Sequence, residues 1–188
     1  MKNVVKLFSI GVMTVLLSFN ASMSFAQGKG GTIKKGACYI GNMENPEQIA
    51  AYGIPAWLFK TMSFSFNGDI GLMVVQRCVY SINTYTGGLG EALASETYDK
   101  GTPFSYSVKN GYIYIWDQGE KEPKVESDYM IILKIESDGL TLLKTQIDGL
   151  KLSKLVYMAD YNKMKKMSEE ELVQVEKEAL NKLKLLRN

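Results

Sequence analysis

The sequence predicts a small antiparallel β protein, with the succession of strands and tight turns that is typical of a barrel. Its apolar segments alternate in polarity with period two, as strands with one buried face do. Asn-Gly and Asp-Gly pairs separate several of these segments, and such pairs favour the tight turns of β-hairpins. A chain of 188 residues with 46% hydrophobic composition is long enough for a single domain with its own core.

The start of the chain, residues 1–26, has the features of a secretory signal peptide. Lys2 and Lys6 give a basic start, an apolar stretch follows, and Ser24 and Ala26 are the small residues expected before a cleavage site. The apolar stretch is shorter than the roughly 20 residues that a membrane-spanning helix needs. We therefore expect an exported protein, periplasmic or extracellular, with no membrane span in the mature chain.

Charge and composition exclude several classes of function. Loss of the leader leaves equal numbers of basic and acidic residues, so we expect no nucleic-acid binding. The chain has no histidine, which excludes Ser-His-Asp, Cys-His and His-based zinc sites. Several of its carboxylates lie with lysines in a charged loop over residues 117–128. The remaining enzymatic alternative is a hydrolase that uses two of these carboxylates as general acid and base. We predict a non-enzymatic protein with no catalytic residue, metal site or cofactor.

The segment after the leader combines a flexible part with a short helix. Residues 27–36 are rich in Gly and Lys and predict a flexible lead, and residues 37–41 predict a short first strand. Asn45-Pro46 is typical of a helix start, and Gly53 can end a helix. We therefore predict a short N-terminal helix over residues 45–52.

Two cysteines, Cys38 and Cys78, predict a disulfide in an oxidising compartment. The bond would close a loop of about 40 residues and stabilise the fold by about 3–4 kcal/mol. Two buried thiols that never meet are the alternative.

The first long hairpin is predicted around Asn67-Gly68-Asp69. A three-residue loop keeps one apolar set of both strands on a single face, whereas a shift by one residue would mix the faces. That face holds Met62, Phe64, Phe66, Ile70, Leu72 and Val74. The second strand continues through Tyr80, and residues 84–100 then predict either a surface loop or a lid, with 91–94 as helix or strand.

The second hairpin turns at Asn110-Gly111, a pair suited to the positive φ angles of a type I′ turn. The turn pairs Lys109 with Tyr112 and so places Phe104, Tyr106, Val108, Ile113 and Ile115 on one apolar face. The opposite face carries the three aromatic residues Tyr112, Tyr114 and Trp116. These are either an interaction surface, a packing surface for a terminal helix, or ordinary strand residues.

The last part of the chain predicts a third hairpin, a final strand and a helix. Residues 129–142 form the hairpin, with Leu133 on its apolar face, and residues 150–157 form the strand. Ser168 and Glu171 form a capping box, after which apolar residues recur at helical spacing within 161–188. This long amphipathic C-terminal helix either packs on the sheet or mediates self-association or partner binding.

Four stretches carry a resemblance to lipocalin-like (calycin-type) secreted bacterial β-barrel domains. They are Trp57 before the first long strand and residues 64–70, 106–113 and 135–142. The resemblance implies an up-and-down barrel of about eight strands over residues 37–160, around a small apolar pocket. The Gly-x-Trp motif of lipocalins is not present, because Gly53 and Trp57 have the wrong spacing.

Two functions follow from these predictions. The first is binding of a small, mostly apolar ligand in the barrel, lined by the apolar faces of the hairpins. The lining residues would be Phe64, Phe66, Leu72, Val74, Tyr106, Ile113, Ile115 and Leu133. The second is a protein–protein interaction module that uses the C-terminal helix or the Tyr112/Tyr114/Trp116 face.

Overall fold

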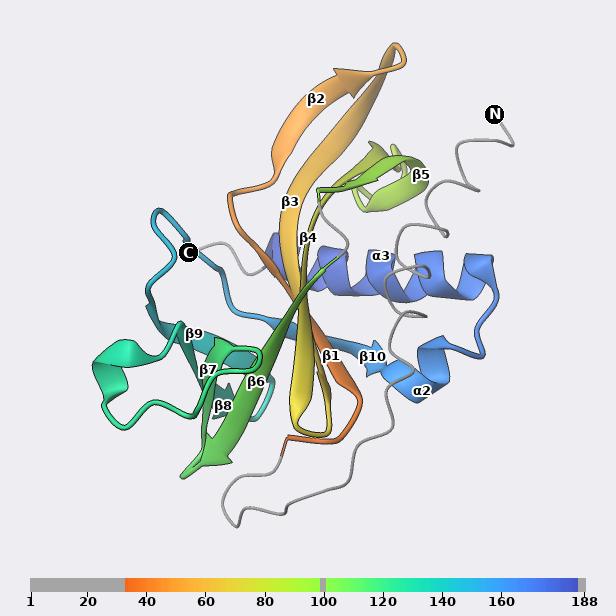
Figure 1. Cartoon of the computed structure of the whole chain (residues 1–188). Coiled ribbons are helices and arrows are strands. Elements are labelled where there is room, and N and C mark those ends of the chain that lie inside the picture. The colour runs from red at the N-terminus through yellow and green to blue at the C-terminus, as the bar shows by residue number, and fades with distance from the viewer. Residues whose placement is uncertain (1–32, 99–100, 186–188) are drawn as a thin grey trace.

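The computed structural model describes residues 33–98 and 101–185, and these form a mainly antiparallel β structure with a C-terminal helix (Figure 1). The predicted signal peptide and residues 27–32 of the lead lie outside the described residues. The elements in chain order are β1 (Ala37–Asn42), β2 (Glu47–Ala51), β3 (Ile54–Asn67), β4 (Ile70–Ile82), β5 (Leu89–Thr97), β6 (Thr102–Lys109), β7 (Tyr112–Asp117), the 3-10 turn η1 (Glu126–Asp128), β8 (Ile131–Glu136), β9 (Gly139–Thr145), β10 (Val156–Asp160), α2 (Tyr161–Met164) and α3 (Glu169–Leu185).

The long β3–β4 hairpin connects two parts of the sheet. One half of β3 pairs with β1 and the other with β2, and β4 is shared in the same way between β6 and β5. One part is therefore the path β10-β1-β3-β4-β6-β7-β8-β9, and the other is a four-stranded end, β2-β3-β4-β5. In Figure 1 the β2–β3 hairpin forms the upper extremity of the described chain, away from β6–β9.

The two ends of the eight-strand path meet at one residue pair. Leu140 in β9 and Leu155, just before β10, exchange backbone hydrogen bonds with N···O distances of 2.9 and 2.8 Å. Within the described ranges no ladder of strands continues from this pair, so the sheet is antiparallel but is not closed into a barrel by its strands.

The turn at Asn110-Gly111 is confirmed. Both residues have positive φ, 52° and 82°, and the β6–β7 register pairs Lys109 with Tyr112 and Phe104 with Asp117.

The predicted loop of the β3–β4 hairpin is wrong by one residue. The turn has two central residues, Gly68 and Asp69, because Asn67 pairs with Ile70 and Phe66 with Gly71. The prediction failed because both faces of β4 are apolar, so the period-two pattern favoured a register that the structure does not have. Gly71 favours the observed register, since a Cβ at this position would lie 2.1 Å from the Phe104 ring.

The predicted short N-terminal helix is also wrong. Residues 47–51 form β2, which pairs with β3 from Leu58 to Ile54. Pairing with a long strand outweighs a weak local helix signal, since propensity is overridden by tertiary contacts. In the region predicted as a surface loop or lid, the strand alternative for 91–94 is confirmed, because strand β5 pairs with β4 there and Ala94 pairs with Val79.

The predicted disulfide is wrong, because Cys38 and Cys78 are both buried free thiols. Cys38 pairs with Ser65 on β3, and Ser65 pairs with Leu72 on β4. Leu72 lies about 20 Å along β4 from Cys78, at about 3.3 Å per residue. A disulfide needs Cα atoms within about 7 Å, so these two residues cannot be bridged in this fold. Burial raises the pKa of Cys38 to about 12 and also raises that of Cys78, which keeps both thiols protonated.

The C-terminal helix begins as predicted. The Ser168 amide donates to Glu171 Oε2 (2.7 Å), and the Glu171 amide donates to Ser168 Oγ (3.3 Å). Helix α3 then crosses the β3–β4 hairpin (Figure 1) and packs on the face opposite the interior cluster described below. Its buried stripe meets Ile40, Phe59 and Tyr80.

Candidate functional site

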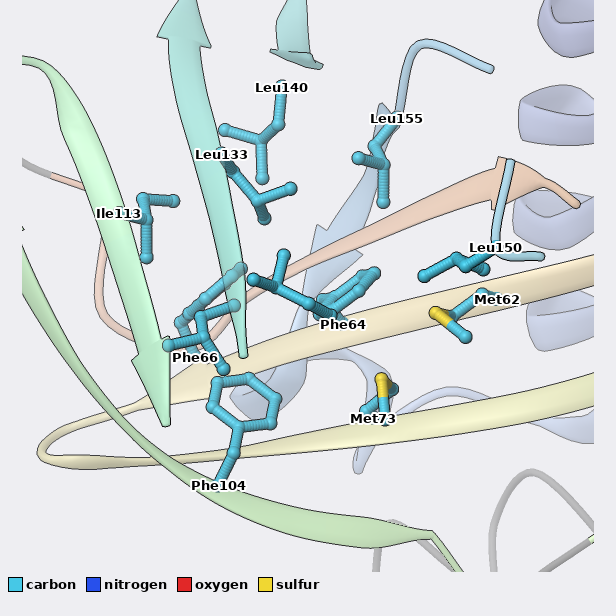
Figure 2. Close-up of a cluster of buried hydrophobic side chains, with 12 residues drawn as sticks. Met62, Phe64, Phe66, Met73, Phe104, Ile113, Leu133, Leu140, Leu150 and Leu155 are labelled. Carbon is cyan, nitrogen blue, oxygen red and sulfur yellow. The ribbon is translucent and has the colours of Figure 1, made fainter. Parts of the chain in front are cut away.

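The predicted ligand-lining residues lie mostly in one buried cluster. Figure 2 shows phenylalanine side chains from β3 and β6 directed toward leucine and isoleucine side chains from β7, β8 and β9. We call this set the interior cluster, and its buried members are Met62, Phe64, Phe66, Met73, Phe104, Ile113, Ile115, Ile131, Leu133, Leu140, Leu150 and Leu155. Phe64, Phe66, Ile113, Ile115 and Leu133 belong to it, and the half-buried Tyr106 packs against it.

Aromatic rings fill the interior cluster. Phe66 lies 5.8 Å from Phe104 and 5.1 Å from Tyr106 between ring centroids, both in edge-to-face geometry. Phe64 completes the group at 6.1 Å from Phe104. Such contacts are typical of a packed core. A ligand would have to displace these rings in order to enter.

Leu72 and Val74, the other two predicted lining residues, are on the opposite face of the sheet. Leu72 pairs with Ser65, and Val74 pairs with Ser63. The side chains of Leu72 and Val74 form a small cluster of their own. The one-residue change in the β3–β4 register moves them there, because a register shift reverses the face of every side chain.

The predicted aromatic interaction face is covered by the following loop. Tyr129 packs on Tyr114 (ring centroids 4.9 Å apart) and on Trp116 (6.0 Å apart). The Trp116 indole donates to the carbonyl of Glu120 (3.1 Å), and Trp116 is buried. Tyr112 lies at the edge of the group, 6.4 Å from Tyr114. The C-terminal helix does not reach this face, since it packs on β10, β1 and β5.

Glu122 attaches this loop to the β6–β7 hairpin. Its Oε1 accepts hydrogen bonds from Ser107 Oγ and Lys109 Nζ, both at 2.6 Å, and from the Tyr129 hydroxyl at 3.2 Å. Partial burial opposes ionisation, but these hydrogen bonds outweigh it and lower the pKa of Glu122. One carboxylate of the charged loop therefore holds the loop on the hairpin.

The tip of the β2–β3 hairpin has an unusual backbone. Tyr52 and Gly53 are the central residues of its two-residue turn, and both have positive φ, 52° and 78°. The same turn type at Asn110-Gly111 uses the preferred residue pair. A tyrosine in this left-handed conformation is strained by about 1 kcal/mol. Its side chain is 78% exposed, so packing does not compensate for that strain.

Two more exposed apolar side chains belong to the same end of the sheet. Ile54 follows the turn and is 42% exposed, and Tyr85 in the β4–β5 loop is 98% exposed. The register places them at the same end of the sheet, because Ala56 pairs with Ser81, and these lie two residues from Ile54 and four from Tyr85. We call Tyr52, Ile54 and Tyr85 the tip surface.

The four-stranded end also has an apolar face. On the side of the four-stranded end opposite α3, buried and half-buried side chains form one cluster. Its members are Ile49, Ala51, Ala56, Leu58, Val79, Leu93 and Ala94. Of the tip-surface residues, Ile54 adjoins this cluster, because it pairs with Ala51.

Sequence reasoning missed the tip surface because residues 45–52 were assigned to a helix. The one local signal is Gly53, which suits the second position of a type I′ turn, whereas tyrosine at position 52 is not a preferred first residue.

No protein-family model, curated protein or solved structure matches this chain. Among the described helices, none is both long and apolar enough to cross a membrane.

Proposed function

We propose that the protein is an exported, non-enzymatic interaction module that binds a protein partner through the tip surface. The observation that carries this proposal is the exposed, strained Tyr52 at the extremity of a hairpin. Backbone strain without a packing contact is expected where a side chain is needed for recognition. Export is supported by the leader-like sequence of residues 1–26.

The chemistry of the tip surface fits a protein partner. Tyrosine provides a large amphipathic contact area and loses little rotamer freedom when it is immobilised. Ile54 and Tyr85 add exposed apolar area at the same end. Exposed apolar groups that gather at one end are more informative than single ones scattered over a surface.

Replacing Tyr52 with asparagine tests the proposal, because asparagine occupies the same position in the turn at Asn110-Gly111. We expect Tyr52→Asn to raise the free energy of unfolding by about 1 kcal/mol, since the left-handed strain is relieved. The same substitution should reduce partner binding at least tenfold, because it removes about 2 kcal/mol of aromatic contact. Urea unfolding and affinity capture from the host envelope measure the two effects.

The matched control is Tyr98→Asn, which removes another exposed tyrosine. Tyr98 follows β5 and its amide donates to the carbonyl of Val75, far along β4 from the tip surface. Capture should be unchanged in this variant. Equal capture by wild type and Tyr52→Asn would refute the proposal.

A second candidate is a lipocalin-like domain that binds a small apolar ligand between its hairpins. The support is that the two ends of the eight-strand path meet at Leu140 and Leu155, and that both residues join the predicted lining residues in the interior cluster. We expect native mass spectrometry of protein purified from its host to show a co-purified small molecule. A spectrum of the ligand-free mass alone, under conditions that retain a known lipocalin ligand, would contradict this candidate.

A further inference from the structure

Glu176 is a carboxyl buried in the contact between α3 and the sheet. It is 4% exposed and lies on the same helical stripe as Leu172 and Leu180, one turn to either side. The surrounding side chains of this contact are apolar, among them Phe59 and Ala179. An ionised carboxylate in such surroundings is costly unless a cation or several donors compensate for the lost water.

The groups that face Glu176 are neutral. The Gln76 side-chain amide donates to Glu176 Oε1 at 2.8 Å, and the Cys78 thiol donates to the same oxygen at 3.1 Å. None of the ion pairs found among the described residues involves Glu176. A carboxylate with two neutral donors and no cation is only partly compensated.

Two other titratable groups, Cys78 and Tyr80 from β4, lie near this carboxyl. Tyr80 from β4 interacts electrostatically with Glu176, and the pKa of Tyr80 is raised by burial and by this neighbour. From β5, Ser95 bonds to the Cys78 thiol and carries no charge. The β1 and β10 side chains packed in this contact, Ile40 and Val156, are apolar. The hydrogen bonds from Gln76 and Cys78 favour the ionised form of Glu176, but burial outweighs them and disfavours a negative charge.

We propose that α3 is a proton-dependent cover of the sheet, which docks while the Glu176 carboxyl is neutral and loosens as that carboxyl ionises. Release of α3 uncovers the face that carries Trp57, Phe59 and Tyr80. This inference is independent of the tip surface, which lies on other residues.

The direction of the pH dependence follows from the two states of Glu176. Burial raises the pKa of Glu176 from 4.5 to about 7 in the docked state. In the released state the carboxyl is solvated and ionises at its ordinary value. Between these values the docked state holds a proton that the released state has lost, so rising pH favours release. Docking of α3 is strongest below about pH 4.5, and it weakens as the pH rises from there to about 7.

Hydrogen exchange of the α3 amides measures the effect. We expect their opening constant, corrected for intrinsic exchange, to rise on the order of 50-fold between about pH 5 and pH 8 in the wild type. Glu176→Gln should flatten this rise to less than about threefold, because it keeps the shape and removes the ionisation. Glu178→Gln, which makes the same charge change on the exposed side of α3, should leave the rise intact.

A flat wild-type profile, or equal slopes in the wild type and Glu176→Gln, would overturn the proposal. A direct titration of the Glu176 carboxyl by carbon NMR covers the case in which the glutamine variant does not fold. We expect a midpoint near pH 7, and a midpoint near the ordinary glutamate value would also overturn it.

Discussion

Replacing Gly71 with alanine is expected to lower the free energy of unfolding by about 3 kcal/mol, as overpacking of a filled core does. Gly71 on β4 lies between Phe66 and Phe104 in the sheet register. The missing side chain leaves room for the Phe104 ring, since a Cβ would lie 2.1 Å from two of its carbon atoms. The ring is fully buried and contacts Phe64, Phe66 and Tyr106, so it has nowhere to move.

A double-mutant cycle with Phe104→Ala identifies the cause. Phe104→Ala alone should cost about 3–5 kcal/mol through the cavity that it leaves. In that background the alanine at position 71 meets no ring, so its additional cost should fall below about 1 kcal/mol. Urea unfolding of the four proteins measures the cycle. Strictly additive costs would show that the two residues do not compete for the same space.

Leu180→Ala is expected to lower the free energy of unfolding by about 3 kcal/mol, the middle of the range for a buried leucine. Leu180 is fully buried between α3 and the sheet, with Ala179 and Leu183 beside it. Its loss removes contacts within one chain. The mass of the native protein in solution should therefore stay unchanged.

This experiment separates the two roles that the sequence allows for the C-terminal helix. Lys177→Ala, a change on a less buried side of the same helix, should alter stability by less than about 0.5 kcal/mol. If Leu180→Ala instead lowers the oligomer mass and leaves the unfolding free energy unchanged, α3 is an interface and not a cover of its own sheet. Light scattering together with urea unfolding measures both quantities.

The hairpins were predictable where local chemistry decides the geometry. Asn110-Gly111 sets its own turn type, so the β6–β7 register followed from two residues. The capping box at Ser168 fixed the start of α3 for the same reason. The β3–β4 turn was not predictable, because both faces of β4 are apolar and Phe104, more than thirty residues away, requires the glycine at position 71.

Features that depend on the fold as a whole were missed. Residues 47–51 have a helix-like start, but the long β3 strand pairs with them. The loop that covers Trp116 does so through Tyr129 and Glu122, which no local pattern connects to the aromatic face. Glu176 did have a sequence signal, since it lies four residues after Leu172 and four before Leu180 in an apolar stripe. A carboxyl at such a position indicates a buried titratable group.

The central claim is that the tip surface binds a partner, and photo-crosslinking from position 52 in the host cell tests it most directly. A benzoylphenylalanine at this position keeps an aromatic ring at the tip and reacts only with groups in contact with it. We expect a discrete adduct from position 52 and none from position 98, where the matched control tyrosine lies. Absence of an adduct from position 52, or the same adducts from both positions, would contradict the claim.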